Sequence, residues 1–175
     1  MKEKVLLVWF IFFFWLSPAS AQTWTGKVLA VRDGDLINIV HPEKGAVPLM
    51  LYGVDAPDEG QPFFAQAKEF LTNRVEGKVV TVREIPGKRK ADTAIITDEG
   101  GNINEQVLEA GLGWVCVKNC DQEFCSDWKK LEARAREEKR GLWQDENPVP
   151  PCEWRQSVLT KIFRIFLWII PPWSD

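Results

Sequence analysis

The chain has 175 residues, about the length of one domain, and 27% of them are charged while 45% are hydrophobic. This composition excludes a disordered or fibrous protein. Twenty-two basic residues against 25 acidic ones give a net charge of −3, which excludes a strongly basic nucleic-acid binder but not a local basic patch. The single histidine disfavours a zinc enzyme built on histidine ligands.

The first residues have the pattern of a secretory signal peptide. An unbroken apolar run of twelve residues extends from Val5 to Leu16, and Ala19-Ser20-Ala21 fits a cleavage site that requires small residues. The alternative is a membrane anchor, but such a run spans only about 18 Å as a helix, against a hydrocarbon core of about 30 Å. We therefore expect residues 1–21 to be removed and the mature protein to be periplasmic or extracellular.

Export would place all four cysteines in an oxidising compartment, where an even number of cysteines favours two disulfides. Three pairings are possible, and we favour Cys120 with Cys125, which leaves Cys116 with Cys152. A four-cysteine metal site is the alternative, but no pair has the C-x₂-C spacing of a zinc ribbon.

Short strands are predicted in the first half of the mature chain, where apolar and polar residues alternate. The turn Asp33-Gly34-Asp35 separates the first two. The expected strands are Trp24–Val31, Leu36–Val40, Val47–Val54, Val79–Val82 and Thr93–Thr97.

Three helices are predicted around and after these strands. The first begins after Pro62 and ends at Gly77, the second begins at Asn104 as its cap and ends at Gly111, and the third runs from about Ser126 to Arg140. The basic residues of the third helix are expected to form a solvated face, with contact to nucleic-acid phosphates as the alternative. The sequence thus predicts a mainly β fold with α, a five-stranded OB-type β-barrel with three helices.

The order of several short motifs resembles the thermonuclease-like (staphylococcal nuclease) family over about residues 24–155. The motifs are Val31-Arg32-Asp33-Gly34-Asp35, Leu51-Tyr52-Gly53-Val54-Asp55-Ala56-Pro57-Asp58, Gly60-Gln61-Pro62, Asn104-Glu105 with Gly111-Leu112, Leu131-Glu132-Ala133-Arg134-Ala135 and Gly141-Leu142-Trp143. The resemblance implies an OB barrel with three helices and a calcium-dependent nuclease acting on DNA and RNA. It gives a domain over residues 22–155 and leaves residues 156–175 as an apolar and basic tail.

The resemblance also implies a set of site residues. Asp35 and Asp55 fall on the two calcium ligands of the family, and Asp58 stands where the family has the glutamate that handles the attacking water. A hard cation held by carboxylates can offset the negative charge that phosphodiester hydrolysis places on oxygen, so the resemblance implies Ca²⁺ as a possible cofactor and nucleic acid as a possible partner.

The departures from the family pattern fall on the chemistry. Met50 and Ala91 occupy the positions of the two phosphate-binding arginines, and Leu36 replaces the threonine usual after the Asp-Gly-Asp turn. Arg89 is a possible substitute cation, although a solvated loop tip is the simpler interpretation of the basic stretch that contains it. Guanidinium groups bind phosphate in a bidentate manner that neither methionine nor alanine can reproduce.

The tail from Val158 to Trp173 is rich in large apolar residues and too short to span a bilayer. It could pack on the barrel or on a protein partner, or lie on a membrane surface. The leading hypothesis is therefore an exported nuclease-like domain, weakly active or inactive, retained to bind nucleic acid or protein. The alternatives are an active calcium-dependent nuclease, and a membrane-surface or scaffold protein that acts through its tail.

Overall fold

A computed structural model of the chain describes residues 22–85, 92–116 and 120–156. The expected signal peptide and the tail from residue 157 onward lie outside the described residues.

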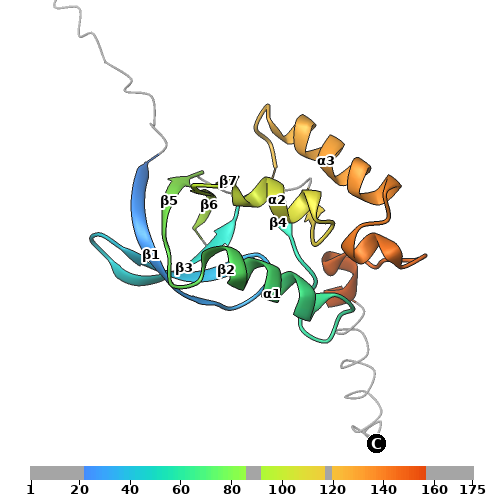
Figure 1. The fold of residues 1–175 in the computed structure, drawn as a ribbon, viewed down its shortest axis with the longest axis horizontal. Coiled ribbons are helices and arrows are strands. Elements are labelled where there is room, and N and C mark those ends of the chain that lie inside the picture. Colours follow the sequence, from blue (N-terminus) through green and yellow to red (C-terminus); the bar gives the residue numbers. More distant parts are fainter. Residues whose placement is uncertain (1–21, 86–91, 117–119, 157–175) are drawn as a thin grey trace, which may run out of the picture.

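Five strands close into a barrel, as predicted (Figure 1). Antiparallel pairing runs in the order β3, β2, β1, β5, β6, and a short parallel pairing of β3 with β6 closes the circle. Closure leaves few exposed strand edges, which is how small antiparallel barrels avoid edge-to-edge association. The strands are β1 Thr23–Val31, β2 Leu36–His41, β3 Gly45–Leu51, β5 Val79–Glu84 and β6 Thr93–Asp98.

The barrel interior contains the residues that the alternating pattern places there. Five side chains that the alternation of the strands directs inward are buried, namely Val28, Val31, Ile37, Leu51 and Val54. Leu71 of the first helix is fully buried against them, and Phe70 packs on the same core while half-buried. The core thus follows from the period-two and helical spacings of the sequence.

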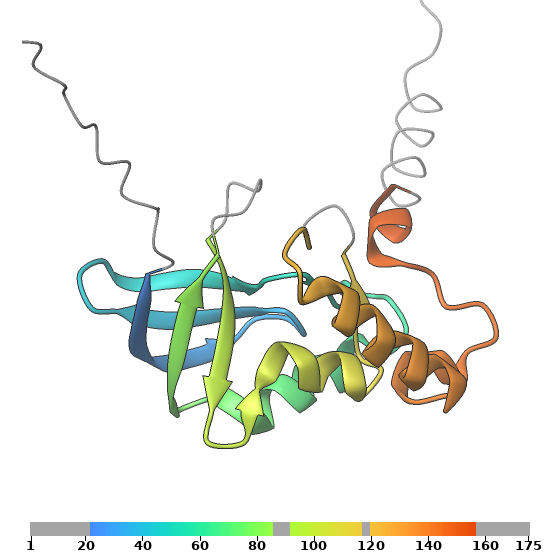
Figure 2. The same ribbon diagram turned by 90° about the horizontal axis from the view of Figure 1, so that it is seen from above.

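The helices lie along one side and one end of the barrel (Figures 1 and 2). They are α1 Phe64–Val75, α2 Ile103–Glu109, α3 Cys125–Glu137 and the short 3₁₀ helix η1 Gly141–Gln144. One cap differs from the prediction: Asn102, not Asn104, accepts the N–H bonds that begin α2. Asn104 instead lies fully buried inside the helix, and its amide donates to the carbonyls of Tyr52 and Ala94.

Three short strands complete the fold. The predicted strand Val47–Val54 is interrupted at Gly53, whose φ of +70° is incompatible with a regular ladder. The remainder forms β4 Val54–Asp55, which pairs with β8 Trp114–Val115, while β7 Gly101–Asn102 extends the hairpin of β6. After η1 the chain passes a proline-rich stretch and becomes helical over residues 151–156.

One of the two expected disulfides is present. Cys120 and Cys125 are bonded just before and at the start of α3. The expected bond between Cys116 and Cys152 is not formed: Cys116 lies half-buried after β8, and Cys152 lies exposed on the C-terminal segment. Over the described ranges, no helix is long and apolar enough to cross a membrane.

Candidate functional site

Asp35 ends the tight turn between β1 and β2. Gly34 of this turn has no room for a side chain, because a Cβ there would lie 2.7 Å from the Cβ atoms of Ala56 and Ala67. The turn therefore packs directly on the segment that carries Asp55. The buried Asp35 carboxylate accepts a long bond of 3.4 Å from the N–H of Ala56.

Asp55 and Asp58 lie on the segment that joins the barrel to α1. Asp55 is buried on β4, directly opposite Trp114 of β8. Asp58 follows in the loop, where it is partly exposed. The Asp35 turn and this segment thus bring together the three acidic residues that the sequence selects.

Arg155 joins two of these acidic residues, and the sequence prediction did not include it. Its Nη1 donates to both carboxylate oxygens of Asp58, at 2.8 and 3.0 Å. Its Nη2 donates to both oxygens of Asp55, at 3.2 and 3.1 Å. A single guanidinium therefore bridges two carboxylates that lie about 100 residues earlier in the chain.

Gln61 fixes the relative position of the loop and the C-terminal segment. This buried side chain accepts from the N–H of Asp58 at 3.0 Å and donates to the carbonyl of Val149. It therefore connects the loop that carries Asp58 to the stretch that precedes Arg155. Pro151 is buried at the first turn of the C-terminal helical segment, a position that suits proline.

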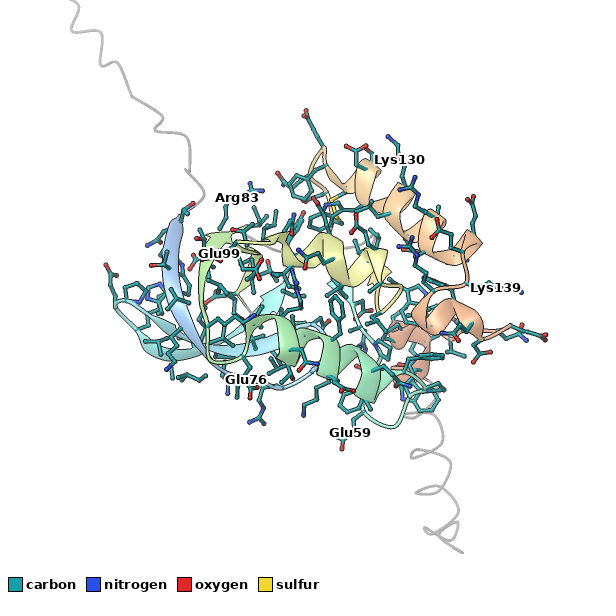
Figure 3. All side chains as sticks on the ribbon, viewed as in Figure 1. Glu59, Glu76, Arg83, Glu99, Lys130 and Lys139 are labelled. Atoms are coloured by element: carbon teal, nitrogen blue, oxygen red, sulfur yellow. A yellow bond between two sulfur atoms is a disulfide. The ribbon has the colours of Figure 1, made fainter. Side chains whose placement is uncertain are left out.

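The charges around the site are predominantly negative. Burial lowers the pKa of Arg155, but the charges and hydrogen bonds of Asp55 and Asp58 outweigh burial and raise that pKa above its ordinary value. Burial also raises the pKa of Asp33, and the nearby charges of Asp58 and Glu59 add to the increase. Figure 3 shows Glu59 pointing outward from the same loop.

The two apolar substitutions of the site are neighbours. Leu36 and Met50 face each other across the β2–β3 ladder, and both are half-buried. Leu36 directly follows Asp35, so this edge of the site presents an apolar pair where the family resemblance calls for a hydroxyl and a guanidinium. Ala91 and Arg89, with the rest of their basic stretch, lie outside the described residues.

A hollow of about 90 Å³ opens beside the carboxylates. Aromatic rings and prolines make up half of its lining residues. Trp114 and Trp154 connect it to the site, because Trp114 pairs with Asp55 in the ladder and Trp154 precedes Arg155 in the chain. The backbone of Phe63, one of the lining residues, is strained, since its φ of 67° is rare for a bulky residue. The lining residues are Gln61, Pro62, Phe63, Trp114, Leu142, Asp145, Asn147, Pro148, Val149 and Trp154.

The fold and the site define a class of protein. It is a small OB-type barrel with two paired acidic residues, one on β4 and one on the loop that leads into α1. The sequence model of the protein family described as "Staphylococcal nuclease homologue" matches residues 36–145 of this chain. The chain belongs to this family, as its motifs predicted.

Relatives with nuclease names match over most of the chain. An "Uncharacterized endonuclease" of Escherichia coli is 34% identical over 158 residues, which cover 89% of this chain and 98% of the relative. An "Uncharacterized endonuclease" of Haemophilus influenzae is 26% identical over 90% of this chain and 88% of its own length. A "Micrococcal nuclease" of Shigella flexneri is 28% identical over 80% of this chain and 84% of its own length.

The side chains around Asp55 do not fit the calcium ion that the family implies. All four oxygens of Asp55 and Asp58 accept hydrogen bonds from Arg155. Among the residues that the structure describes, no group of three or more His, Cys, Asp or Glu side chains is placed to hold a metal ion. Calcium in proteins takes six to eight oxygen ligands, and here the carboxylate oxygens of Asp55 and Asp58 are already engaged by a guanidinium.

Proposed function

We propose that this chain is a nuclease-family domain that hydrolyses phosphodiesters weakly or not at all and is retained to bind single-stranded nucleic acid. The observation that carries the first part is the engagement of Arg155 by Asp55 and Asp58. A phosphodiester needs positive charge to approach these carboxylates, and the guanidinium found there is already paired with them. Met50 supplies no charge on the opposite edge.

The expected loss of rate is large. Removing one preorganised donor that stabilises a transition state costs about 10²–10³ in rate, and removing a transition-state arginine costs about 10³–10⁵. Met50 and Ala91 together remove both family arginines. Because such losses combine, cleavage by the wild-type protein should lie near the background.

The aromatic hollow supports the binding role. Trp114 and Trp154 offer flat apolar surfaces on which a base can stack, and stacking contributes about 1–3 kcal/mol per base. The exposed Lys139 lies two residues before η1, whose Leu142 lines the hollow, and its ammonium can contact the backbone of such a strand (Figure 3). The carboxylates of Asp55 and Asp58 would repel the negatively charged strand, so we place nucleic-acid binding on the hollow and not on these acidic residues.

Fluorescence anisotropy with a labelled single-stranded oligonucleotide tests this proposal. We expect saturable binding that weakens about tenfold in Trp154→Ala, as the loss of one stacking contact implies. The control Val79→Ala removes an exposed apolar residue of β5, far along the chain from the hollow, and should bind like the wild type. Binding that is absent in the wild type would instead favour a protein partner, and binding that is equal in Trp154→Ala would show that the hollow is not the binding site.

A second candidate, an active nuclease, is favoured by the same guanidinium. Arg155 could leave the carboxylates and contact the phosphate in place of the missing arginines. In that case the full-length protein cleaves DNA well and Arg155→Met abolishes cleavage. Under the first proposal, wild type and Arg155→Met both remain close to background.

We further propose that the protein is exported. The support is the apolar run Val5–Leu16 followed by Ala19-Ser20-Ala21. N-terminal sequencing of protein recovered from cells should begin at Gln22, and a chain that still begins at Met1 would contradict export. A membrane or partner role for the tail stays a prediction, which flotation with liposomes before and after truncation at residue 156 would test.

A further inference from the structure

Two carboxylates that lie close together repel each other unless a cation is near both. Asp55 has little access to water to screen this repulsion, because only 7% of its side chain is exposed, compared with 26% for Asp58. Family members are expected to solve the problem with Ca²⁺. In this chain the Arg155 guanidinium donates to both carboxylates and occupies the position between them.

The contact is built into the fold and is not a chance encounter of a surface arginine. Gln61 connects the Asp58 loop to Val149, a few residues before Arg155. Trp154, the residue before Arg155, lines the hollow together with Phe63. The N–H groups of Glu153 and Trp154 both bond to the Pro150 carbonyl, so the helical turn that carries Arg155 begins at a fixed place.

The geometry also suits a guanidinium better than any other protein cation. Its two terminal nitrogens each carry two N–H groups and can each serve a separate carboxylate, whereas the ammonium of lysine is a compact point charge on one nitrogen. Each nitrogen of Arg155 that contacts the pair meets both oxygens of one carboxylate, with all four distances between 2.8 and 3.2 Å.

We propose that Arg155 is the resident counter-ion of Asp55 and Asp58 and takes the place of the divalent cation, so that this domain holds its site together without calcium. This inference rests on the proposed function, because it concerns the same site and gives a reason for weak hydrolysis. It goes further in assigning a role to a residue beyond the matched family region, which ends at residue 145.

Binding of Ca²⁺ in the absence of nucleic acid tests the proposal directly. Isothermal titration of the full-length wild type should show no saturable binding at this site below millimolar Ca²⁺. Arg155→Met frees the two carboxylates and should bind at least tenfold more tightly. Arg134→Met removes the same charge from an exposed position of α3 and should behave like the wild type. Adding Asp55→Asn to Arg155→Met should abolish the gained binding.

Thermal unfolding gives a second readout. The melting temperature of the wild type should be the same with Ca²⁺ or with a chelator, whereas Arg155→Met should melt earlier and recover when Ca²⁺ is added, because a ligand that binds only the folded state stabilises it. Arg155→Lys keeps the positive charge and covers the case in which the methionine variant fails to fold. Its Ca²⁺ affinity should lie above that of the wild type, since one ammonium cannot satisfy both carboxylates.

Wild-type binding as tight as that of Arg155→Met or Arg155→Lys would overturn the proposal. So would an Arg155→Met protein that folds but gains no Ca²⁺ affinity. Neither result bears on whether the wild type cleaves or binds nucleic acid, so failure here is distinguishable from failure of the proposed function.

Discussion

Leu36 and Met50 are direct partners in the β2–β3 ladder, and this pairing joins two departures from the family pattern into one apolar edge next to Asp35. A polar residue at either position alone would face an apolar neighbour. The two substitutions are therefore best regarded as one change, which replaces the phosphate-binding side of the site with hydrocarbon.

Restoring the arginines should expose the part that Arg155 plays. Met50→Arg with Ala91→Arg should raise Ca²⁺-dependent plasmid cleavage only slightly while Arg155 remains paired with the two carboxylates. When Arg155→Met is added, cleavage should rise by orders of magnitude, because guanidinium groups return to the phosphate positions and the carboxylates become available to Ca²⁺. An equal increase with and without Arg155 would contradict the idea that this arginine occupies the cation's place.

Asn104 should be one of the most sensitive positions for stability. It is fully buried, its Oδ1 accepts from the Ile96 N–H, and its amide donates to the carbonyls of Tyr52 and Ala94. Asn104→Ala removes these three buried hydrogen bonds and should cost about 2–4 kcal/mol in the free energy of unfolding, measured in urea. The exposed Asn73→Ala on α1 should change the same quantity by less than about 0.5 kcal/mol.

The raised pKa of Asp33 predicts a pH-dependent stability. Burial disfavours the ionised carboxylate in the folded state, so the folded protein binds the proton more tightly than the unfolded chain. The stability that Asp33 contributes is thus present at low pH and is lost as the pH rises from the ordinary value of 3.8 through the raised one. Asp33→Asn should melt at a higher temperature than the wild type at pH 7.

The wild type and Asp33→Asn should have nearly equal melting temperatures at pH 3, where Asp33 is protonated. Glu43→Gln, in the exposed turn between β2 and β3, serves as the charge-matched control and should not reproduce this difference. A wild type that is more stable than Asp33→Asn at pH 7 would show that the bond from the Gly34 N–H outweighs the cost of burial.

The disulfide should contribute measurably to stability. Cys120 and Cys125 close a short loop that packs on Gly53, where a Cβ would lie 2.7 Å from the Cys120 sulfur. Chain-entropy arguments give a loop of this size about 2 kcal/mol. Cys120→Ser with Cys125→Ser should lower the free energy of unfolding by about that amount, whereas adding reductant to this double variant should have little further effect on the barrel.

The strands and helices of this fold could be predicted because each depends on residues that are close together in the sequence. Alternation of side chains indicated the five barrel strands, and helical spacing placed Leu71 on the core. The cap of α2 was assigned two residues too late, because Asn102 and Asn104 have the same chemistry and only the burial of Asn104 distinguishes them.

The non-local parts of the site could not be predicted. Asp35 and Asp55 stand in motifs that can be matched, whereas Arg155 stands in none and contacts Asp58 across 97 residues of chain. A lone arginine after a proline-rich stretch gives no periodic or spacing signal. The pairing of β4 with β8 places Trp114 beside Asp55. It involves only two residues on each strand, which is too short for a recognisable alternation in the sequence.

The most direct test of the incomplete site is the rate at which the full-length wild type cleaves supercoiled plasmid in Ca²⁺, compared with Asp35→Ala under the same conditions. We expect both proteins to remain within a few-fold of the rate without enzyme, because no cation in the described site is available to the phosphate. Robust Ca²⁺-dependent cleavage by the wild type, lost in Asp35→Ala, would show that the site is a working nuclease centre after all.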